Sequence, residues 1–324
     1  MPTLLLLTLL ASDPNAASRM ERESIADLST AELAFSDGRT KLSQHRGQPI
    51  VYAWFRDAGY SMDAAERAAK LQADYARKGL IVVLLDTESD GSLDQNSKSR
   101  AFLLGRFSGY NGASGGLNCS APVKQTYDAG AGIALIGVDG RLVTRGACRE
   151  VGGKLTKLIG AELSMAKKGW GDDDLAKKIR ALAFGKGAYA AAVALVEANP
   201  EPAVQEAIAD VENRVAGEFA RLDALTAHGR VQAADILIEE LAESLKGRDD
   251  WIKALAQRQE RWLSFRTEAL IAFDKHCRRA ESALDRGKAL SKSQYEALKA
   301  LKVETLGSER LEAILALSSA LGAR

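Results

Sequence analysis

Residues 50–63 read Ile-Val-Tyr-Ala-Trp-Phe-Arg-Asp-Ala-Gly-Tyr-Ser-Met-Asp. The apolar run at the start follows Pro49, a residue tolerated at the beginning of a strand, so Ile50–Phe55 is predicted to be a β-strand. Small and apolar side chains then recur at helical spacing from Met62 to Lys78, and Gly79 suits the position just after a helix. The stretch therefore predicts a strand, a turn and a helix in succession.

Strand and helix patterns continue to alternate beyond this unit. Leu80–Leu85 is a near-continuous apolar run, typical of a strand buried on both faces of a parallel sheet. Ile133–Val138 and Arg141–Thr144 are predicted to form a hairpin, because Asp139-Gly140 between them is a strong two-residue turn signal. Helices are predicted at about 121–128 and 150–166. The alternation predicts an α/β layer structure.

Past Trp170 no strand pattern survives. Helical periodicity covers the segments 172–184, 187–198, 202–227, 230–246, 250–285 and 291–322. Glycines and prolines between these segments mark their boundaries. Residues 171–324 are therefore predicted to be an all-α region.

A weak internal repeat lies within this region. Gly187–Glu197 aligns with Gly229–Glu239, and both are rich in small residues that let paired helices approach closely. The pattern resembles helical hairpins of the tetratricopeptide type, without their full signature. Two unrelated Ala-rich helices after glycine turns would give the same pattern, and the sequence leaves both interpretations open.

The first residues resemble a secretion signal. The apolar run Leu4–Ala11 is too short to span a bilayer but has the length of a signal-peptide core, and small residues follow it. No Lys or Arg precedes Arg19, and the alternative is a buried N-terminal strand or helix. We expect residues 1–18 to be a signal peptide, which predicts a periplasmic or secreted protein with no transmembrane helix after cleavage.

Charge and composition exclude several classes of function. The 44 basic and 43 acidic residues are well mixed and give a net charge of +1, so nothing indicates a nucleic-acid surface. The three cysteines and three histidines have no metal-ligand spacing, and no glycine-rich loop has the spacing that binds phosphates. No cofactor and no metal are predicted.

Residues from Phe35 to about Gly160 resemble the thioredoxin-like superfamily, in its redoxin branch. The features that carry the resemblance are, in order, Ser36-Asp37-Gly38, Leu42-Ser43, Arg46-Gly47-Gln48-Pro49, the strand with Trp54, Ile81–Asp86, Ala134-Leu135-Ile136 and Asp139-Gly140-Arg141-Leu142. The resemblance covers about two fifths of the chain. It implies an α/β thioredoxin-like domain over residues 33–166, with a central mixed sheet flanked by helices, followed by the α-helical region of hairpins over 171–324.

The active site of that family is degenerate in this sequence. On the family pattern, the Cys-x-x-Cys motif falls on Ala58, Gly59, Tyr60 and Ser61. The first thiolate of such a motif does the chemistry, whereas Ala58 offers no nucleophile and Ser61 has no histidine beside it as a base. The family's cis-proline falls near Ala131, and residues 123–199 contain no proline. The resemblance therefore implies that the redox chemistry has been lost.

The cysteines outside this motif allow other hypotheses. The family topology places Cys119 and Cys148 at the active-site end, where they could form a structural disulfide in an oxidising compartment. They could also be a relocated redox pair, although neither is expected at a helix start after a central strand, or they could be small buried hydrophobes. Cys277 is expected in the core of a helical segment.

Two further segments have features of ligand sites. Asp86–Asp94 has oxygens at alternate positions like a calcium loop, but Ser97 stands where the bidentate glutamate is needed, so a solvated acidic loop is preferred. Ser61 and its neighbouring amides could bind an anion, whereas a helix cap is the simpler interpretation.

These observations favour a non-catalytic thioredoxin-like protein of the cell envelope. It would act as a binding or assembly module, with a protein or peptide partner held by the C-terminal helices, because stacked helical hairpins form concave surfaces. The alternative is a thiol-disulfide oxidoreductase or redoxin-type enzyme that uses Cys119 and Cys148, or a cysteine of its partner.

Overall fold

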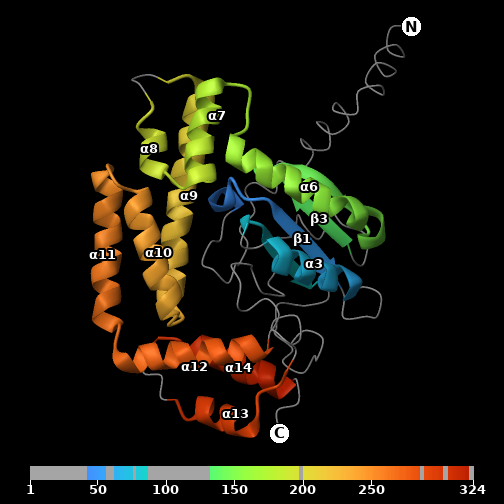
Figure 1. Cartoon of the computed structure of the whole chain (residues 1–324), viewed down its shortest axis with the longest axis vertical. Coiled ribbons are helices and arrows are strands. Elements are labelled where there is room, and N and C mark those ends of the chain that lie inside the picture. The colour runs from blue at the N-terminus through green and yellow to red at the C-terminus, as the bar shows by residue number, and fades with distance from the viewer. Residues whose placement is uncertain are drawn as a thin grey trace.

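The opening stretch folds as predicted on both sides of its turn. The computed structural model describes residues 42–55, 62–75, 78–86, 132–196, 200–284, 288–301 and 306–320. Strand β1 spans Ile50–Phe55 and helix α3 spans Met62–Tyr75 (Figure 1). Gly79 adopts a positive φ of 103°, which suits a residue that ends a helix.

Strand β1 lies inside a four-stranded sheet with the order β2-β1-β3-β4. The other strands are β2 (Ile81–Asp86), β3 (Gly132–Ile136) and β4 (Leu142–Gly146). Strand β1 pairs in parallel with β2 and antiparallel with β3, and β3 pairs antiparallel with β4. The sheet is therefore mixed, and β4 runs in the same direction as β1.

Both faces of the sheet are buried. On one face, Val51 and Ala53 pack with side chains of α3 and α6 (Cys148–Lys168), and Figure 1 shows these two helices lying across the strands. On the other face, Ile50 and Tyr52 are 2% and 1% exposed. This two-sided burial explains why the strands read as apolar runs rather than as alternating patterns.

The hairpin turn differs from the prediction. Strand β3 ends at Ile136 and β4 begins at Leu142, so the connection is longer than the predicted two-residue turn. The Gly137 N–H donates to the Arg141 carbonyl at 2.7 Å, and Asp139 Oδ1 accepts from the Arg141 N–H at 3.0 Å. The Val138 N–H donates to Glu162 of α6 at 3.0 Å. This bond to α6 helps hold the longer connection against the helix.

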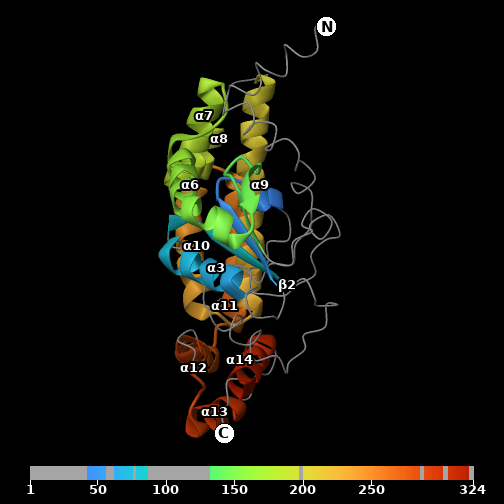
Figure 2. The same ribbon diagram turned by 90° about the vertical axis from the view of Figure 1, so that its right-hand side faces the viewer.

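Only helices follow the sheet in the described residues. They are α6, α7 (Asp174–Arg180), the π-helical η5 (Ala181–Gly185), α8 (Tyr189–Val193), α9 (Pro202–Ala227), α10 (Val231–Ser244), α11 (Asp249–Phe265), α12 (Glu268–Leu284), α13 (Lys292–Lys299) and α14 (Ser308–Ala320). In these ranges no helix combines the length and apolarity needed to cross a membrane. Figures 1 and 2 show α12, α13 and α14 grouped beyond the ends of α10 and α11.

Two predicted helical segments are each divided in two. The segment 250–285 breaks between α11 and α12, where the Arg266 N–H bonds to the Trp262 carbonyl and Thr267 Oγ1 accepts from the Leu270 N–H at 3.2 Å. A hydroxyl in that position caps a new helix, and apolar periodicity does not reveal it. The segment 291–322 also forms two helices, α13 and α14.

The two aligned repeat segments share a turn but not a helix length. Gly187 and Gly229 have φ of 68° and 63°, and each is followed by a residue of similar conformation before α8 or α10. The Ala188 N–H bonds back to the Leu182 carbonyl, and the Arg230 N–H bonds to the Leu225 carbonyl, in the pattern of a glycine helix end. Helix α8 ends at Val193, well short of the predicted boundary at 198, so the hairpin repeat stays a prediction.

A buried carboxylate joins the segment before β1 to the helices. Asp210 of α9 is 5% exposed, and its Oδ2 accepts from Arg180 Nε of α7 at 2.9 Å. Its Oδ1 lies 3.6 Å from Arg46 Nε, in the turn between η2 (Leu42–His45) and β1. The Arg180 Nη1 also donates to the Trp170 carbonyl at 3.1 Å. Asp210 therefore links segments that are distant in the sequence.

We expect the stability contribution of Asp210 to increase in acid. Burial raises the pKa of this carboxyl above its usual value, and Arg180 and Arg46 oppose the rise. The folded protein then holds the proton more tightly than the unfolded chain, so the contribution falls as the pH rises through the raised pKa. The free energy of unfolding of wild type minus that of D210N should therefore increase as the pH is lowered from neutral. Urea titrations at a series of pH values measure it, and a shift in the opposite direction would contradict burial as the dominant cause.

Candidate binding groove

The degenerate redox site lies outside the described part of the chain, since its positions are Ala58, Gly59, Tyr60, Ser61 and Ala131. Cys119 of the predicted cysteine pair also lies outside it. The described residues on either side of the site do meet, because Gly132 at the start of β3 pairs with Trp54 near the carboxyl end of β1. The acidic segment considered for calcium follows Asp86 and also lies outside the described residues.

Cys148 is the one member of the predicted cysteine pair that the structure describes. It is half-buried at the first position of α6, which begins slightly before the predicted helix start at about 150. Gly146 of β4 pairs with Ile133, which pairs with Ala53 of β1. Cys148 therefore lies towards the end of the sheet at which β1 ends. The strand before it is the edge strand β4 and not a central one. The pairing of Cys119 with Cys148 stays a prediction.

Cys277 lies in a helical core, as predicted. It is 0% exposed and packs among α12, α13 and α14 with Phe273, Leu298 and Ile314. Burial raises the pKa of its thiol to about 12, and Arg310 nearby opposes that rise only in part. A thiol this hard to ionise does not serve as a nucleophile at neutral pH.

A buried ionic network adjoins Cys277. Arg310 of α14 is 5% exposed and donates from Nε and Nη2 to the two carboxylate oxygens of Glu281, each at 2.9 Å. Its Nη1 donates to Asp274 Oδ1 at 2.9 Å and to the Gly229 carbonyl at 3.2 Å. Arg230 Nη2 adds a bond to Glu281 Oε1 at 3.0 Å. Opposite charges joined by several hydrogen bonds offset the free-energy cost of removing the ions from water.

The network fixes the corner where α12 meets α10. Asp274 and Glu281 belong to α12, Arg310 to α14, and Gly229 to the turn before α10. Asp274 Oδ2 also accepts from the Gln232 N–H of α10 at 3.1 Å and from Arg278 Nε at 3.1 Å. The angle between the two helices is therefore set by directional bonds and not by apolar packing alone.

A groove lies along this corner, between α10 and α12, and we call it the α10–α12 groove. Its volume is about 340 Å³. It is lined by Val231, Gln232, Asp235, Ile236, Glu239, Arg266, Ile271, Asp274 and Arg278. Ile236 on α10 and Ile271 on α12 are 47% and 38% exposed, so each helix presents an accessible aliphatic side chain to it.

Most charged groups of the groove already have fixed partners. Asp235 Oδ1 accepts from the indole Nε1 of Trp262 at 2.9 Å, and Oδ2 accepts from Arg266 Nη2 at 2.9 Å. Arg278 bonds to Asp274 and to the Gln232 side-chain oxygen. A site whose polar groups are held in place loses little conformational entropy when a ligand binds.

Sequence reasoning did not find this groove, although one signal was present. The buried side chains of α10 recur at Val231, Ala234, Leu237 and Leu241, and Ile236 lies off that stripe. A single exposed apolar residue is common on protein surfaces, so this signal alone does not identify a groove. That Ile271 lies opposite depends on the break between α11 and α12.

No cluster of histidine, cysteine and acidic side chains that could hold a metal ion occurs among the described residues. His45 lies in η2, His228 follows the end of α9, and His276 lies in α12.

The comparisons with known proteins leave the family of the chain open. No protein-family model and no curated protein matches it. A solved structure described as a putative thiol:disulfide interchange protein DsbE from Chlorobium tepidum is 19% identical, over 41% of this chain and 92% of that chain, with a TM-score of 0.31. A TM-score this low does not establish a shared fold. The mixed four-stranded sheet with helices packed on it, followed by helices alone, itself fits a thioredoxin-like domain and a helical region.

Loss of Arg310 should destabilise the protein strongly. Replacing it with methionine leaves the carboxylates of Asp274 and Glu281 buried without their main partner, which costs about 3–5 kcal/mol of unfolding free energy. R310K keeps the charge but not the forked geometry, and should lose less. Chemical denaturation measures both. The control is D223N, which removes the carboxylate of the exposed pair with Arg258 and should cost no more than about 1 kcal/mol. Equal effects of R310M and D223N would contradict the importance of the network.

Cys277 should resist modification until the helices unfold. In a C119S/C148S variant it is the last thiol of the chain. A pKa of about 12 instead of 9.0 lowers the thiolate fraction at neutral pH about a thousandfold, and burial blocks the reagent as well. Reaction with a colorimetric disulfide reagent should be slow in native buffer and rapid in denaturant. Rapid modification of the native protein would show that the thiol is accessible.

Proposed function

We propose that this chain is a non-catalytic thioredoxin-like protein of the cell envelope that binds a protein or peptide through its helical region. In this proposal residues 1–18 are a signal peptide, residues 33–166 form the thioredoxin-like domain, and residues 171–324 hold the partner. The observation that carries the proposal is the α10–α12 groove, whose walls expose Ile236 and Ile271.

The groove has the chemistry expected of a peptide-binding surface. Covering each of the two half-exposed isoleucines would contribute about 1 kcal/mol. Beside the isoleucines, the lining carboxylates Asp235 and Asp274 already form ion pairs. Few charged groups of the groove therefore need to lose bound water when a partner covers it. Apolar contacts with a prearranged polar rim are typical of protein and peptide recognition.

The absence of sulfur at positions 58–61 supports the non-catalytic half of the proposal. These positions read Ala-Gly-Tyr-Ser, so no thiol is available where the thioredoxin-like resemblance places one. Cys277 does not replace it, because its thiol is buried and hard to ionise.

One observation favours the alternative, a thiol-disulfide oxidoreductase or redoxin-type enzyme. Cys148 begins α6, on the side of the sheet where β1 ends. Insulin reduction and peroxidase assays on the purified protein test this function, with C119S and C148S as controls. Turnover that disappears in C148S would replace the non-catalytic proposal. Wild-type turnover no faster than that of C119S/C148S would support the non-catalytic proposal.

The variant I236D should abolish binding at the groove. A carboxylate on α10 would leave the partner's apolar side chains against a charge. The full chain is immobilised and panned against a library of random peptides displayed on phage. Wild type should enrich a common sequence that I236D does not retain.

L175D is the matched control for this experiment. Leu175 of α7 is 37% exposed and does not line the groove, so L175D adds the same charge at an equally accessible site and should keep the enriched sequence. Circular dichroism checks that both variants are folded. No enriched sequence on wild type, or equal enrichment on I236D, would contradict peptide binding at the groove.

A further inference from the structure

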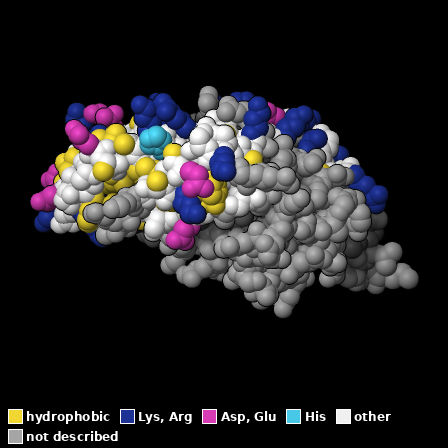
Figure 3. All heavy atoms as spheres, turned by 90° about the horizontal axis from the view of Figure 1, so that it is seen from below, with side chains coloured by type: hydrophobic (Ala, Val, Ile, Leu, Met, Phe, Trp, Pro, Cys, Tyr) yellow, Lys and Arg dark blue, Asp and Glu magenta, His cyan; other side chains and the backbone are white. Residues whose placement is uncertain are grey.

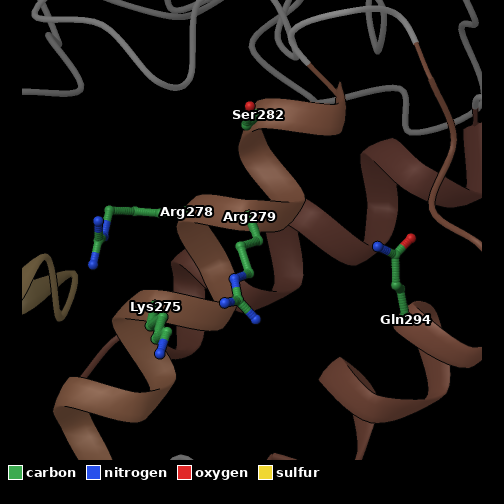
Figure 4. Close-up of a pocket in the computed structure, with 5 residues that line it drawn as sticks. All are labelled: Lys275, Arg278, Arg279, Ser282 and Gln294. Atoms are coloured by element: carbon green, nitrogen blue, oxygen red, sulfur yellow. The ribbon is translucent and has the colours of Figure 1, made fainter.

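The α10–α12 groove adjoins a second hollow farther along α12, which we call the basic hollow. Its volume is about 680 Å³, and it is lined by Lys275, Arg278, Arg279, Ser282 and Gln294. Figure 4 shows Lys275 and Arg279 extending side by side from α12, with Gln294 on α13 across from them. Arg278 lines both hollows, so they form one continuous surface.

The basic hollow carries positive charge that no acidic side chain of the described residues pairs with. Lys275 and Arg279 are exposed, and neither has a salt-bridge partner among the residues that the structure describes. Ser282 and Gln294 add hydrogen-bond donors. The whole chain carries a net charge of only +1, so this local excess does not reflect a basic protein. Figure 3 shows basic side chains gathered along one side of this end of the molecule, beside apolar ones.

The apolar and basic parts of the surface follow one another along α12. Ile271 and Lys275 are four residues apart, as are Lys275 and Arg279, and this spacing puts neighbouring side chains on one helix face. A ligand that covers Ile271 and runs along the helix therefore meets the two cations next.

We propose that the partner of this surface is a peptide segment in which aliphatic residues are followed by acidic ones. The aliphatic side chains pack on Ile236 and Ile271, and the carboxylates pair with Lys275 and Arg279. This inference rests on the proposed function of the α10–α12 groove and adds the chemical class of the partner. Complementary charge at the rim of an apolar contact gives such a site its specificity.

Other anionic ligands match the surface less well. A free oxyanion would use the cations but leave both isoleucines exposed. A single-stranded nucleic acid needs aromatic side chains on which bases stack, and neither hollow is lined by one. An acidic peptide with aliphatic residues uses both parts of the surface.

The composition of the peptides enriched by the full chain tests this inference. Wild type should select sequences that place aspartate or glutamate next to aliphatic residues. K275E/R279E should lose that acidic preference while keeping the aliphatic one. The control K154E/K157E makes the same charge change at two exposed lysines of α6 and should select as wild type does.

Affinity for the selected peptide gives the quantitative result. A fluorescein-labelled peptide of the consensus sequence should bind K275E/R279E about tenfold or more weakly than wild type, and added salt should weaken wild type more than the variant. Enrichment that depends on Ile236 but shows no excess of acidic residues would overturn this inference and leave the proposed function standing. No enrichment at all would overturn both.

Two further outcomes would also overturn the inference. Sedimentation velocity would reveal self-association, and a dimer that I236D dissociates would identify a second copy of the chain as the occupant. Cosedimentation with vesicles of anionic phospholipid that K275E/R279E abolishes, without peptide enrichment, would identify a lipid surface instead.

Discussion

Arg310 donates hydrogen bonds to two carboxylates, Asp274 and Glu281, and to the backbone carbonyl of Gly229, all of them away from water. A guanidinium is suited to this position because its planar fork can meet several acceptors at once. The residues it joins come from α12, α14 and the turn before α10. The direction in which α12 leaves the rest of the helices therefore depends on these bonds, and so does the existence of the groove beneath them.

The protein treats its buried charges differently in two places. Around Arg310 the cations and carboxylates are matched closely, and the thiol of Cys277 next to them is left neutral. At Asp210 the carboxylate has Arg180 at 2.9 Å and Arg46 farther away at 3.6 Å, and burial outweighs both. The first cluster orients helices around the groove. The second joins the segment before β1 to α7 and α9, so a proton-sensitive contact lies where the sheet meets the helices.

Sequence patterns predicted the elements better than their junctions. The apolar run Ile50–Phe55 and the helical spacing from Met62 placed β1 and the start of α3, because both signals are local, whereas α3 ends at Tyr75 and not at the predicted residue 78. The longer turn after Ile136 and the break between α11 and α12 depend on particular hydrogen bonds, which periodicity does not encode. The α10–α12 groove could not be predicted from the sequence for the same reason. Its corner requires Asp274 and Arg310, 36 positions apart in the chain, to meet in space.

The ionic corner has a consequence for how the molecule responds to heat. The free-energy cost of stripping water from charged groups decreases as temperature rises, since their hydration carries a strongly negative entropy. The contacts of Arg310 with Asp274 and Glu281 therefore lose part of their desolvation penalty on warming. The junction of α12 with α10 is for this reason expected to keep its shape as the temperature rises within the range in which the protein stays folded.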